Sequence, residues 1–105
     1  MKMKIIFIYI TYPPKKDAKH ASLNLLKKRL IACGVILGPT TSQYRWKGKI
    51  VSEKEYILLA KTLPKHFEKT KKEIEKTHPY NTPCIAKIPA TPNKKYFEWL
   101  AKEMQ

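Results

Sequence analysis

The sequence predicts an α+β fold: a ferredoxin-like split βαβ sandwich, extended by a long β-hairpin and a C-terminal helix. Two observations lead to this prediction. The apolar pattern of the 105 residues changes in the order strand, helix, strand, strand, helix, strand, helix. The two middle strands flank a Lys47-Gly48 turn, and their arms are longer than a small domain can easily cover. The length corresponds to one domain, residues 1–105.

The first part of the chain alternates between strand and helix signals. The run Ile5–Ile10 is β-branched or aromatic throughout, which is typical of a strand covered on both faces. Pro13-Pro14 ends it. The pattern then becomes helical, and its leucines at helical spacing are expected to be buried: Leu23, Leu26 and Leu30. Gly38-Pro39 interrupts the following strand and predicts a bulge or a bend there.

Proline and apolar spacing also delimit the second part of the chain. Pro64 suits the first turn of a helix, and His78-Pro79 ends that helix because the residue before proline avoids helical φ and ψ. Its expected buried face is Phe67, Thr70 and Ile74. Asn93 is expected to cap a last helix, whose shared face is Tyr96, Phe97, Leu100 and Met104. We therefore expect strands near 4–11, 32–46, 49–62 and 83–88, and helices near 15–30, 64–77 and 93–103.

The charge of the chain is its most unusual property. Lys and Arg number 22 against 8 Asp and Glu, a formal net charge of +14, and only Arg29 and Arg45 are arginine. Such a surplus attracts polyanions in general. Specific nucleic-acid recognition is not expected, because bidentate readout depends on the planar guanidinium group of arginine. No apolar run is long enough for a membrane span or resembles a signal peptide, so we expect a cytoplasmic protein.

Few residues carry side chains suited to metal binding or catalysis. Cys33 and Cys84 form neither a disulfide framework nor a CxxC motif, and both are expected to be small buried residues. His78, in a rigid segment with two prolines, could join them in a soft Cu(I) or Zn site or could simply meet the helix dipole. His20 and His66 lie among lysines and are expected at the surface.

The remaining candidate functional residues are carboxylates and aromatic residues. Asp17 fits the start of a helix, where a carboxylate meets the helix dipole favourably. Glu53 and Glu55 are two apart in a strand and therefore share one face. Tyr44 and Trp46 could form a stacking platform or pack in a subunit interface. With three glycines the chain cannot build a phosphate-binding loop, and it shows no nucleophile–base pair, so we do not expect an enzyme.

Several blocks together resemble the CutA divalent-cation tolerance family. They lie in the family's order and span nearly the whole chain: Arg29-Leu30-Ile31-Ala32-Cys33, Tyr44-Arg45-Trp46-Lys47-Gly48-Lys49-Ile50, Lys61-Thr62, His78-Pro79-Tyr80-Asn81-Thr82-Pro83 and Tyr96-Phe97-Glu98-Trp99-Leu100. The resemblance implies a ferredoxin-like subunit in a tight homotrimer, with hairpins packed across subunits. It also implies clefts between subunits that gather Cys33, Trp46, Glu55, Lys61, His78 and Tyr80.

The chain departs from the family at positions that bear on metal binding. Some members carry a cysteine and a second histidine as proposed copper ligands, where this chain has Ile10 and Thr77. Acidic or polar residues common in the family are replaced by Lys47, Val51 and Val35. Of the three-ligand set only His78 remains. We therefore expect copper, if bound, at Cys33 or His78 with open coordination, and a cleft lined by lysine as much as by carboxylate.

Two functions follow from the resemblance. The first is a CutA-like divalent-cation tolerance protein that responds to metal ions such as copper, requires no cofactor, and binds copper or another divalent metal weakly if at all. The alternative is a trimeric signalling protein, similar to the PII proteins, that binds a small anion or metabolite in the cleft between subunits. Neither reading involves a membrane. The lysine excess suits the alternative better than it suits a free cation.

Overall fold

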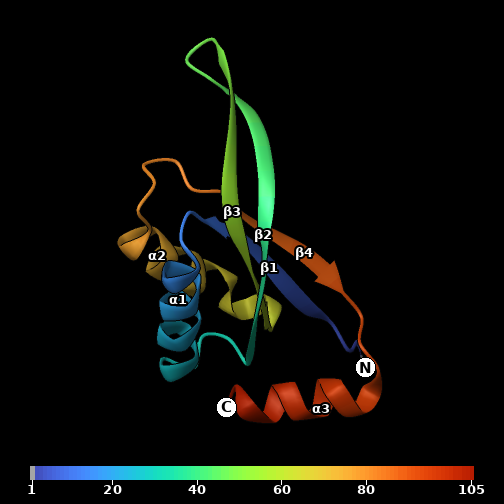
Figure 1. Cartoon of the computed structure of the whole chain (residues 1–105). Coiled ribbons are helices and arrows are strands. Elements are labelled where there is room, and N and C mark those ends of the chain that lie inside the picture. Colours follow the sequence, from blue (N-terminus) through green and yellow to red (C-terminus); the bar gives the residue numbers. More distant parts are fainter. Residues whose placement is uncertain (1) are drawn as a thin grey trace.

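The computed structural model describes residues 2–105, and it has the predicted order of strands and helices (Figure 1). The elements are β1 (Ile5–Tyr12), α1 (Lys15–Lys27), β2 (Cys33–Trp46), β3 (Lys49–Thr62), a short 3₁₀ turn (Pro64–His66), α2 (Phe67–Thr77), β4 (Ile85–Ala90) and α3 (Lys94–Glu103). The four strands form one sheet in the order β2-β3-β1-β4, and every neighbouring pair is antiparallel. This is the strand order of the expected ferredoxin-like fold.

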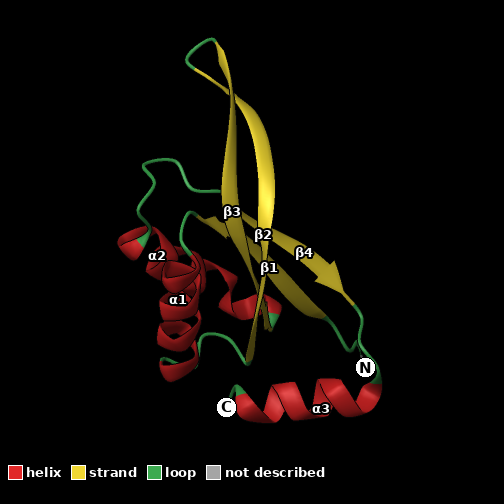
Figure 2. Cartoon of the chain, in the orientation of Figure 1, coloured by secondary structure: helices red, strands yellow, loops and turns green. Residues whose placement is uncertain are grey.

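Helices α1 and α2 cover one face of the sheet (Figure 2). The β1 side chains on this face are the alternate residues Ile6, Ile8, Ile10 and Tyr12, all at most 3% exposed. Their partners on β3 carry Leu58, Ala60 and Thr62, which are fully buried. From α2, Thr70 and Ile74 are buried and Phe67 packs at the edge, as predicted.

The predicted buried face of α1 is wrong for two of its three leucines, while Leu30, just beyond the helix, is partly buried against the core. Leu23 and Leu26 are 53% and 36% exposed, whereas α1 turns Ala18, Ser22 and Leu25 towards the sheet. The reason lies in β2, where Gly34 has no side chain and Ser22 packs directly against its backbone. Small residues allow this close approach of helix and strand, and leucine spacing alone cannot reveal it.

The second face of the sheet is only partly covered. Helix α3 crosses one end of this face. Leu100 and Met104, which the sequence predicts on the buried side of this helix, pack against Ile5. Further along, Phe7 and Tyr9 are half-buried, and Leu37 and Ile88 are 45% and 44% exposed. The prediction that β1 is covered on both faces is therefore correct for one face and wrong for most of the other within a single chain. We call this second side the open face.

The β2–β3 hairpin projects well beyond the two-layer body (Figure 1). Each arm has 14 residues, and the longest dimension of the molecule is 48 Å against 23 and 22 Å across. The register shifts between Leu37 and Thr40, so the bulge predicted at Gly38-Pro39 is present. Lys47 and Gly48 form the turn, both with positive φ.

The end of α1, the bounds of β4 and the cap of α3 differ from those expected. Helix α1 ends at Lys27 rather than near residue 30, because Arg29 adopts a left-handed conformation with φ of 56°. Strand β4 runs from Ile85 through Pro89 to Ala90, which is possible because β4 is an edge strand and needs no second ladder. Asn93 stands at the N-cap position of α3, but its side chain makes no capping hydrogen bond.

The contact between Ser22 and Gly34 gives a stability prediction. An added Cβ at residue 34 would clash with the Ser22 hydroxyl, so Gly34→Ala should destabilise the fold by about 1–3 kcal/mol. Urea unfolding of the variant measures this change. The double variant Ser22→Ala/Gly34→Ala removes the hydroxyl and should recover part of the loss; equal stability of Gly34→Ala and the natural chain would contradict the packing described.

Candidate functional site

A cavity of about 420 Å³ lies between the β2–β3 hairpin and the loop that joins α2 to β4. We call it the hairpin cavity. Its walls are aromatic and hydroxyl-bearing, with a single carboxylate, and comprise Thr11, Tyr44, Trp46, Glu55, Pro79, Tyr80, Asn81, Thr82 and Cys84. Three of the predicted cleft residues, Trp46, Glu55 and Tyr80, therefore meet in one place.

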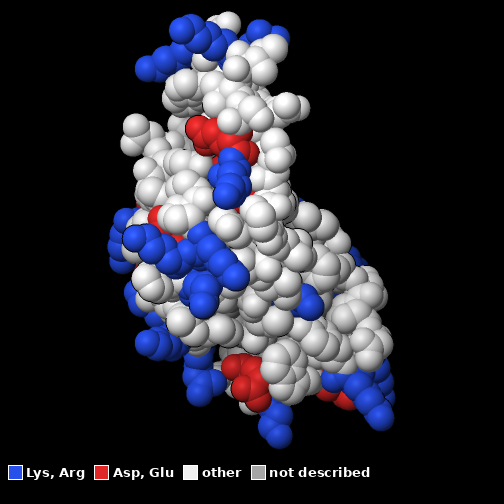
Figure 3. All heavy atoms as spheres, in the orientation of Figure 1, with Lys and Arg blue, Asp and Glu red and all other residues white. Residues whose placement is uncertain are grey.

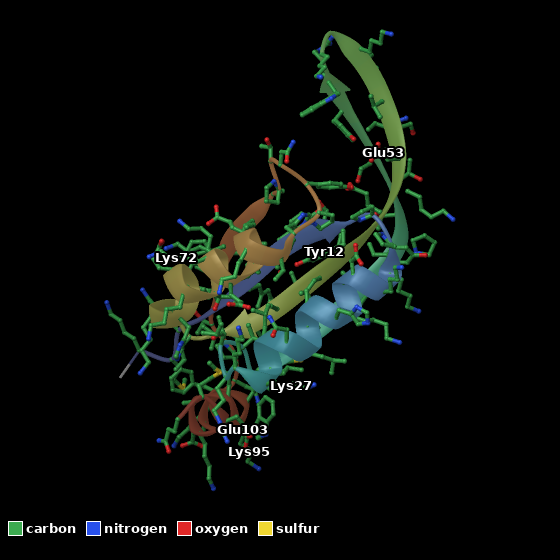
Figure 4. All side chains as sticks on the ribbon, turned by 90° about the vertical axis from the view of Figure 1, so that its left-hand side faces the viewer. Tyr12, Lys27, Glu53, Lys72, Lys95 and Glu103 are labelled. Atoms are coloured by element: carbon green, nitrogen blue, oxygen red, sulfur yellow. The ribbon has the colours of Figure 1, made fainter. Side chains whose placement is uncertain are left out.

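Glu55 is the central polar group of the hairpin cavity. It is 5% exposed, and the Tyr80 hydroxyl donates a hydrogen bond of 2.6 Å to its carboxylate. Burial, together with this hydrogen bond to Glu55, raises the pKa of Tyr80, which keeps the phenol protonated and able to donate. Glu53 lies on the same face of β3, as expected, but nearer the hairpin tip (Figure 4). Burial, and then a hydrogen bond to Glu53, raise the pKa of Tyr44 beside it.

His78 connects the cavity loop to the end of β1. Its Nδ1 accepts a hydrogen bond of 3.0 Å from the Tyr80 backbone N–H, and its Nε2 lies 2.7 Å from the Thr11 carbonyl oxygen. A carbonyl only accepts, so Nε2 carries the proton and the ring is a neutral tautomer. The ring also stacks on Tyr12, with centroids 4.4 Å apart. Both nitrogens are thus already used to position the loop.

The remaining predicted residues, Cys33 and Lys61, lie elsewhere. They are register partners at the opposite end of the sheet, and Lys61 is also opposite Phe7. The Lys61 ammonium lies 5.3 Å from the ring centre of Tyr96 on α3. His78 contacts Thr11, four residues along β1, so Cys33 and His78 are separated by roughly 13 Å along the strand direction. Within one chain they cannot share a metal ion.

The metal-binding groups are dispersed throughout the described residues. Among residues 2–105, no cluster of three or more His, Cys, Asp or Glu side chains is arranged to hold a metal ion. The expectation that both cysteines are buried is wrong: Cys33 is half-buried and Cys84 is exposed. Of the histidines expected at the surface, His20 is exposed but His66 is half-buried.

The expected mixture of lysine and carboxylate is not found in the hairpin cavity. Among the described residues its lining contains Glu55 and no lysine. Sequence reasoning missed Thr11, Asn81, Thr82 and Cys84 as lining residues. Asn81 and Thr82 could have been predicted, because they belong to the proline-bounded segment that carries Tyr80. Thr11 joins the site only through the pairing of β1, which the sequence does not show directly.

Comparisons with known proteins identify the relatives of this chain. The family model described as CutA1 divalent ion tolerance protein matches residues 6–103. The chain is 38% identical over 94 residues to the divalent-cation tolerance protein CutA of Thermus thermophilus, covering 89% of this chain and 91% of that protein. It is 35% identical over 100 residues to CutA of Archaeoglobus fulgidus, covering 94% and 97%.

Solved structures agree with the sequence matches. The structure titled as the periplasmic divalent cation tolerance protein CutA from Archaeoglobus fulgidus superposes with a TM-score of 0.93 at 34% identity, covering 96% of this chain and 99% of that one. CutA1 from Ehrlichia chaffeensis gives a TM-score of 0.92 at 33% identity, with 96% and 95% coverage. The fold and the sequence similarity therefore indicate the same relatives.

The buried position of His78 makes stability depend on pH. Burial lowers the pKa of His78 below its ordinary value of 6.5, although the hydrogen bond to Thr11 opposes this. In the window below pH 6.5 the unfolded chain binds a proton that the folded chain does not, so stability should fall as the pH falls. Urea unfolding between about pH 7.5 and 5 measures the slope.

Substitutions at each histidine show which residue causes this pH dependence of stability. His78→Gln should flatten it, while His20→Gln, at an exposed histidine, should leave it unchanged. His66→Gln accounts for the second histidine whose pKa burial lowers. A slope that persists in full after His78→Gln would show that His78 does not couple folding to protonation.

Proposed function

The chain belongs to the CutA1 divalent ion tolerance protein family, and from this premise we propose that it responds to divalent metal ions without holding one tightly. The family description names tolerance and no reaction, in agreement with the expectation that the chain is not an enzyme. We propose that residues 1–105 act as one CutA-like domain and require no resident cofactor.

The state of His78 is the observation that supports weak metal binding. Copper at His78 would have to displace either the Tyr80 N–H or the Thr11 carbonyl from the ring. Either loss leaves a backbone group unpaired in a partly buried site, which typically costs about 1–3 kcal/mol. Ile10 and Thr77, at the positions of the family's other proposed ligands, offer no imidazole or thiolate.

We further propose that the working form is a homotrimer. The open face presents half-buried and exposed apolar residues over β1–β4, including Tyr9, Leu37, Leu59 and Ile88. Figure 3 shows a broad uncharged area beside the hairpin. Lysine and arginine gather at the hairpin tip, over the helices and along the lower edge. An apolar face of this kind, flanked by long arms with unpaired edges, favours association with further copies.

Association would also explain the separation of the predicted residues. Cys33 and Lys61 lie at one end of the open face and the hairpin cavity lies at the other. A neighbouring subunit could supply Lys61 to the cavity of the first, which would restore the mixed lining expected for an intersubunit cleft. In that arrangement Trp46, Glu55, Lys61 and Tyr80 would line one site.

A small metabolite in this cleft is the second candidate function. Tyr44 and Trp46 provide flat apolar surfaces, and the buried Glu55 accepts hydrogen bonds at a fixed position. Within one chain this lining suits a neutral ring with donor groups better than an anion. A small anion would depend on the lysine contributed by a neighbour.

For location we propose the cytoplasm, supported by two free cysteines, Cys33 and Cys84. No helix of the described residues is both long and apolar enough to cross a bilayer. The related proteins differ in their named compartments: the Archaeoglobus fulgidus structure is titled periplasmic and the Arabidopsis thaliana protein is chloroplastic.

Light scattering tests the trimer. At micromolar concentration and moderate salt we expect three subunits, with a formal charge of +42 (3 × 14), because the apolar face outweighs the mutual repulsion. Leu37→Lys should favour dissociation, since it places a charge on the open face. Leu23→Lys, at a similarly exposed leucine on α1, serves as the control and should stay trimeric. A monomeric natural chain would overturn the proposal.

Calorimetry with Cu(II) tests the metal assignment. We expect weak binding that His78→Ala leaves nearly unchanged, because the ring nitrogens are engaged with the backbone. His20→Ala removes an exposed imidazole and should reduce the weak heats more. Tight binding of one copper per subunit that His78→Ala abolishes would show instead that the loop rearranges to expose a true copper site.

A further inference from the structure

A second cavity, of about 330 Å³, lies between α1 and α2 at the end of β1. We call it the interhelix cavity. Its polar lining includes Asp17, His20 and Asn24 from α1, Glu73 from α2, and Tyr12 from β1. It lies on the helix-covered side of the sheet, so assembly through the open face would leave it accessible. It shares only Pro79 with the hairpin cavity.

The Tyr12 hydroxyl is the unusual group in this cavity. Tyr12 is 2% exposed, and its hydroxyl has no hydrogen-bond partner among the described residues. An unpaired buried hydroxyl costs free energy, which a ligand atom of suitable chemistry could recover. The ring cannot easily turn away, because it stacks on His78, which two backbone groups hold. Burial, reinforced by Asp17, raises the pKa of Tyr12 to about 12, so the group stays a neutral phenol.

The charge of the lining is opposite to that of the protein. In a chain of net charge +14, the interhelix cavity has two carboxylates and, among the described residues, neither lysine nor arginine in its walls. Asp17 forms no salt bridge within residues 2–105. Glu73 pairs with Lys28 at 2.8 Å and with Lys76 at 3.6 Å, and the hydrogen bonds from Lys28 and Asn24 lower its pKa to about 2, so it remains charged. Asp17 is therefore the carboxylate of this lining that no lysine among the described residues neutralises.

The spacing of the acidic groups argues against a directly coordinated metal ion. No set of three or more His, Cys, Asp or Glu side chains in the described residues is close enough to hold one. An organic cation is less demanding, because an ammonium group needs only two or three acceptors within hydrogen-bond distance. Asp17 and the phenol oxygen of Tyr12 are such acceptors, and Asn24 keeps its side-chain carbonyl oxygen while its amide donates to Glu73.

We propose that the interhelix cavity binds a small organic ammonium ion, a primary amine or diamine, whose charged nitrogen lies between the Asp17 carboxylate and the Tyr12 hydroxyl. A short alkyl chain would cross the side of Ala21 towards Asn24 and Glu73, where a second ammonium group would compete with Lys28 and Lys76 for the other carboxylate. Asp17 is half-exposed and His20 is exposed, so their side chains can move aside to admit the ligand to the sealed hydroxyl. This site is independent of the proposed function.

Amide NMR titration with 1,4-diaminobutane at neutral pH and constant ionic strength tests the proposal. We expect saturable shifts in α1, α2 and the end of β1 of the natural chain. Asp17→Asn should weaken binding by about tenfold, because it removes the partner charge, and Tyr12→Phe should weaken it by about threefold. Glu68→Gln, at an exposed α2 carboxylate paired with Lys71 and outside the cavity, should bind as the natural chain does.

Each alternative outcome is distinguishable. If Asp17→Asn and Glu68→Gln bind the diamine with equal affinity, binding depends only on the general charge of the protein. That result would overturn the proposal of a site at Asp17. Equal shifts from 1,4-butanediol, which has the same carbon chain without charge, would overturn the ammonium class. Shifts confined to Tyr44, Trp46 and Tyr80 would move binding to the hairpin cavity. Unchanged affinity in a folded Tyr12→Phe variant would overturn the proposed position of the ammonium group, which depends on that hydroxyl. If Tyr12→Phe folds poorly, Asp17→Asn still decides, because Asp17 is half-exposed.

Discussion

The pairing of β1 on both of its edges is the constraint on which the remaining structure depends. β3 and β4 bind its two sides, so its alternate residues are committed to two different environments. Ile6, Ile8 and Ile10 face the helices and are buried within the chain, whereas Phe7 and Tyr9 face the open side and stay half-buried. A one-residue shift of this strand would exchange the two sets, so the core and the open face are fixed together.

The end of β1 also fixes both cavities. The backbone carbonyl of Thr11 accepts a hydrogen bond from His78, and the ring of the next residue, Tyr12, stacks on the same imidazole. His78 then accepts the Tyr80 N–H, and the Tyr80 hydroxyl reaches Glu55 on β3. The segment that resembles the family motif therefore acts first as a structural clamp. His78 shapes the hairpin cavity through its two hydrogen bonds to the backbone.

The fold could be predicted from the sequence because its signals are local. Pro64, the Gly38-Pro39 bulge and the Lys47-Gly48 turn each restrict the backbone by their own chemistry. The buried face of α1 could not be predicted, because it depends on Gly34, twelve residues beyond Ser22 and on another element. The candidate site residues come from the family resemblance, as a cleft between subunits, and not from local signals. Within one chain Glu55 and Tyr80 meet, whereas Cys33 and Lys61 follow the strand register to the other end of the sheet.

The distribution of charge connects these features to function. Lysine and arginine gather at the hairpin tip, over the helices and along the lower edge (Figure 3), while three of the four carboxylates that are not exposed line cavities: Glu55 in one, and Asp17 and Glu73 in the other. The side chains around each of these carboxylates differ in charge from the lysine-rich outer surface. Because salt screens exposed charges from one another beyond about 10 Å, the outer lysines act mainly on molecules already close to the surface, and a ligand inside a cavity meets chiefly the carboxylates in its wall. A strongly basic protein can therefore offer a site for a cation where the wall of a cavity carries a carboxylate that no lysine neutralises, which is the arrangement that residues 2–105 show for Asp17 in the proposed ammonium site.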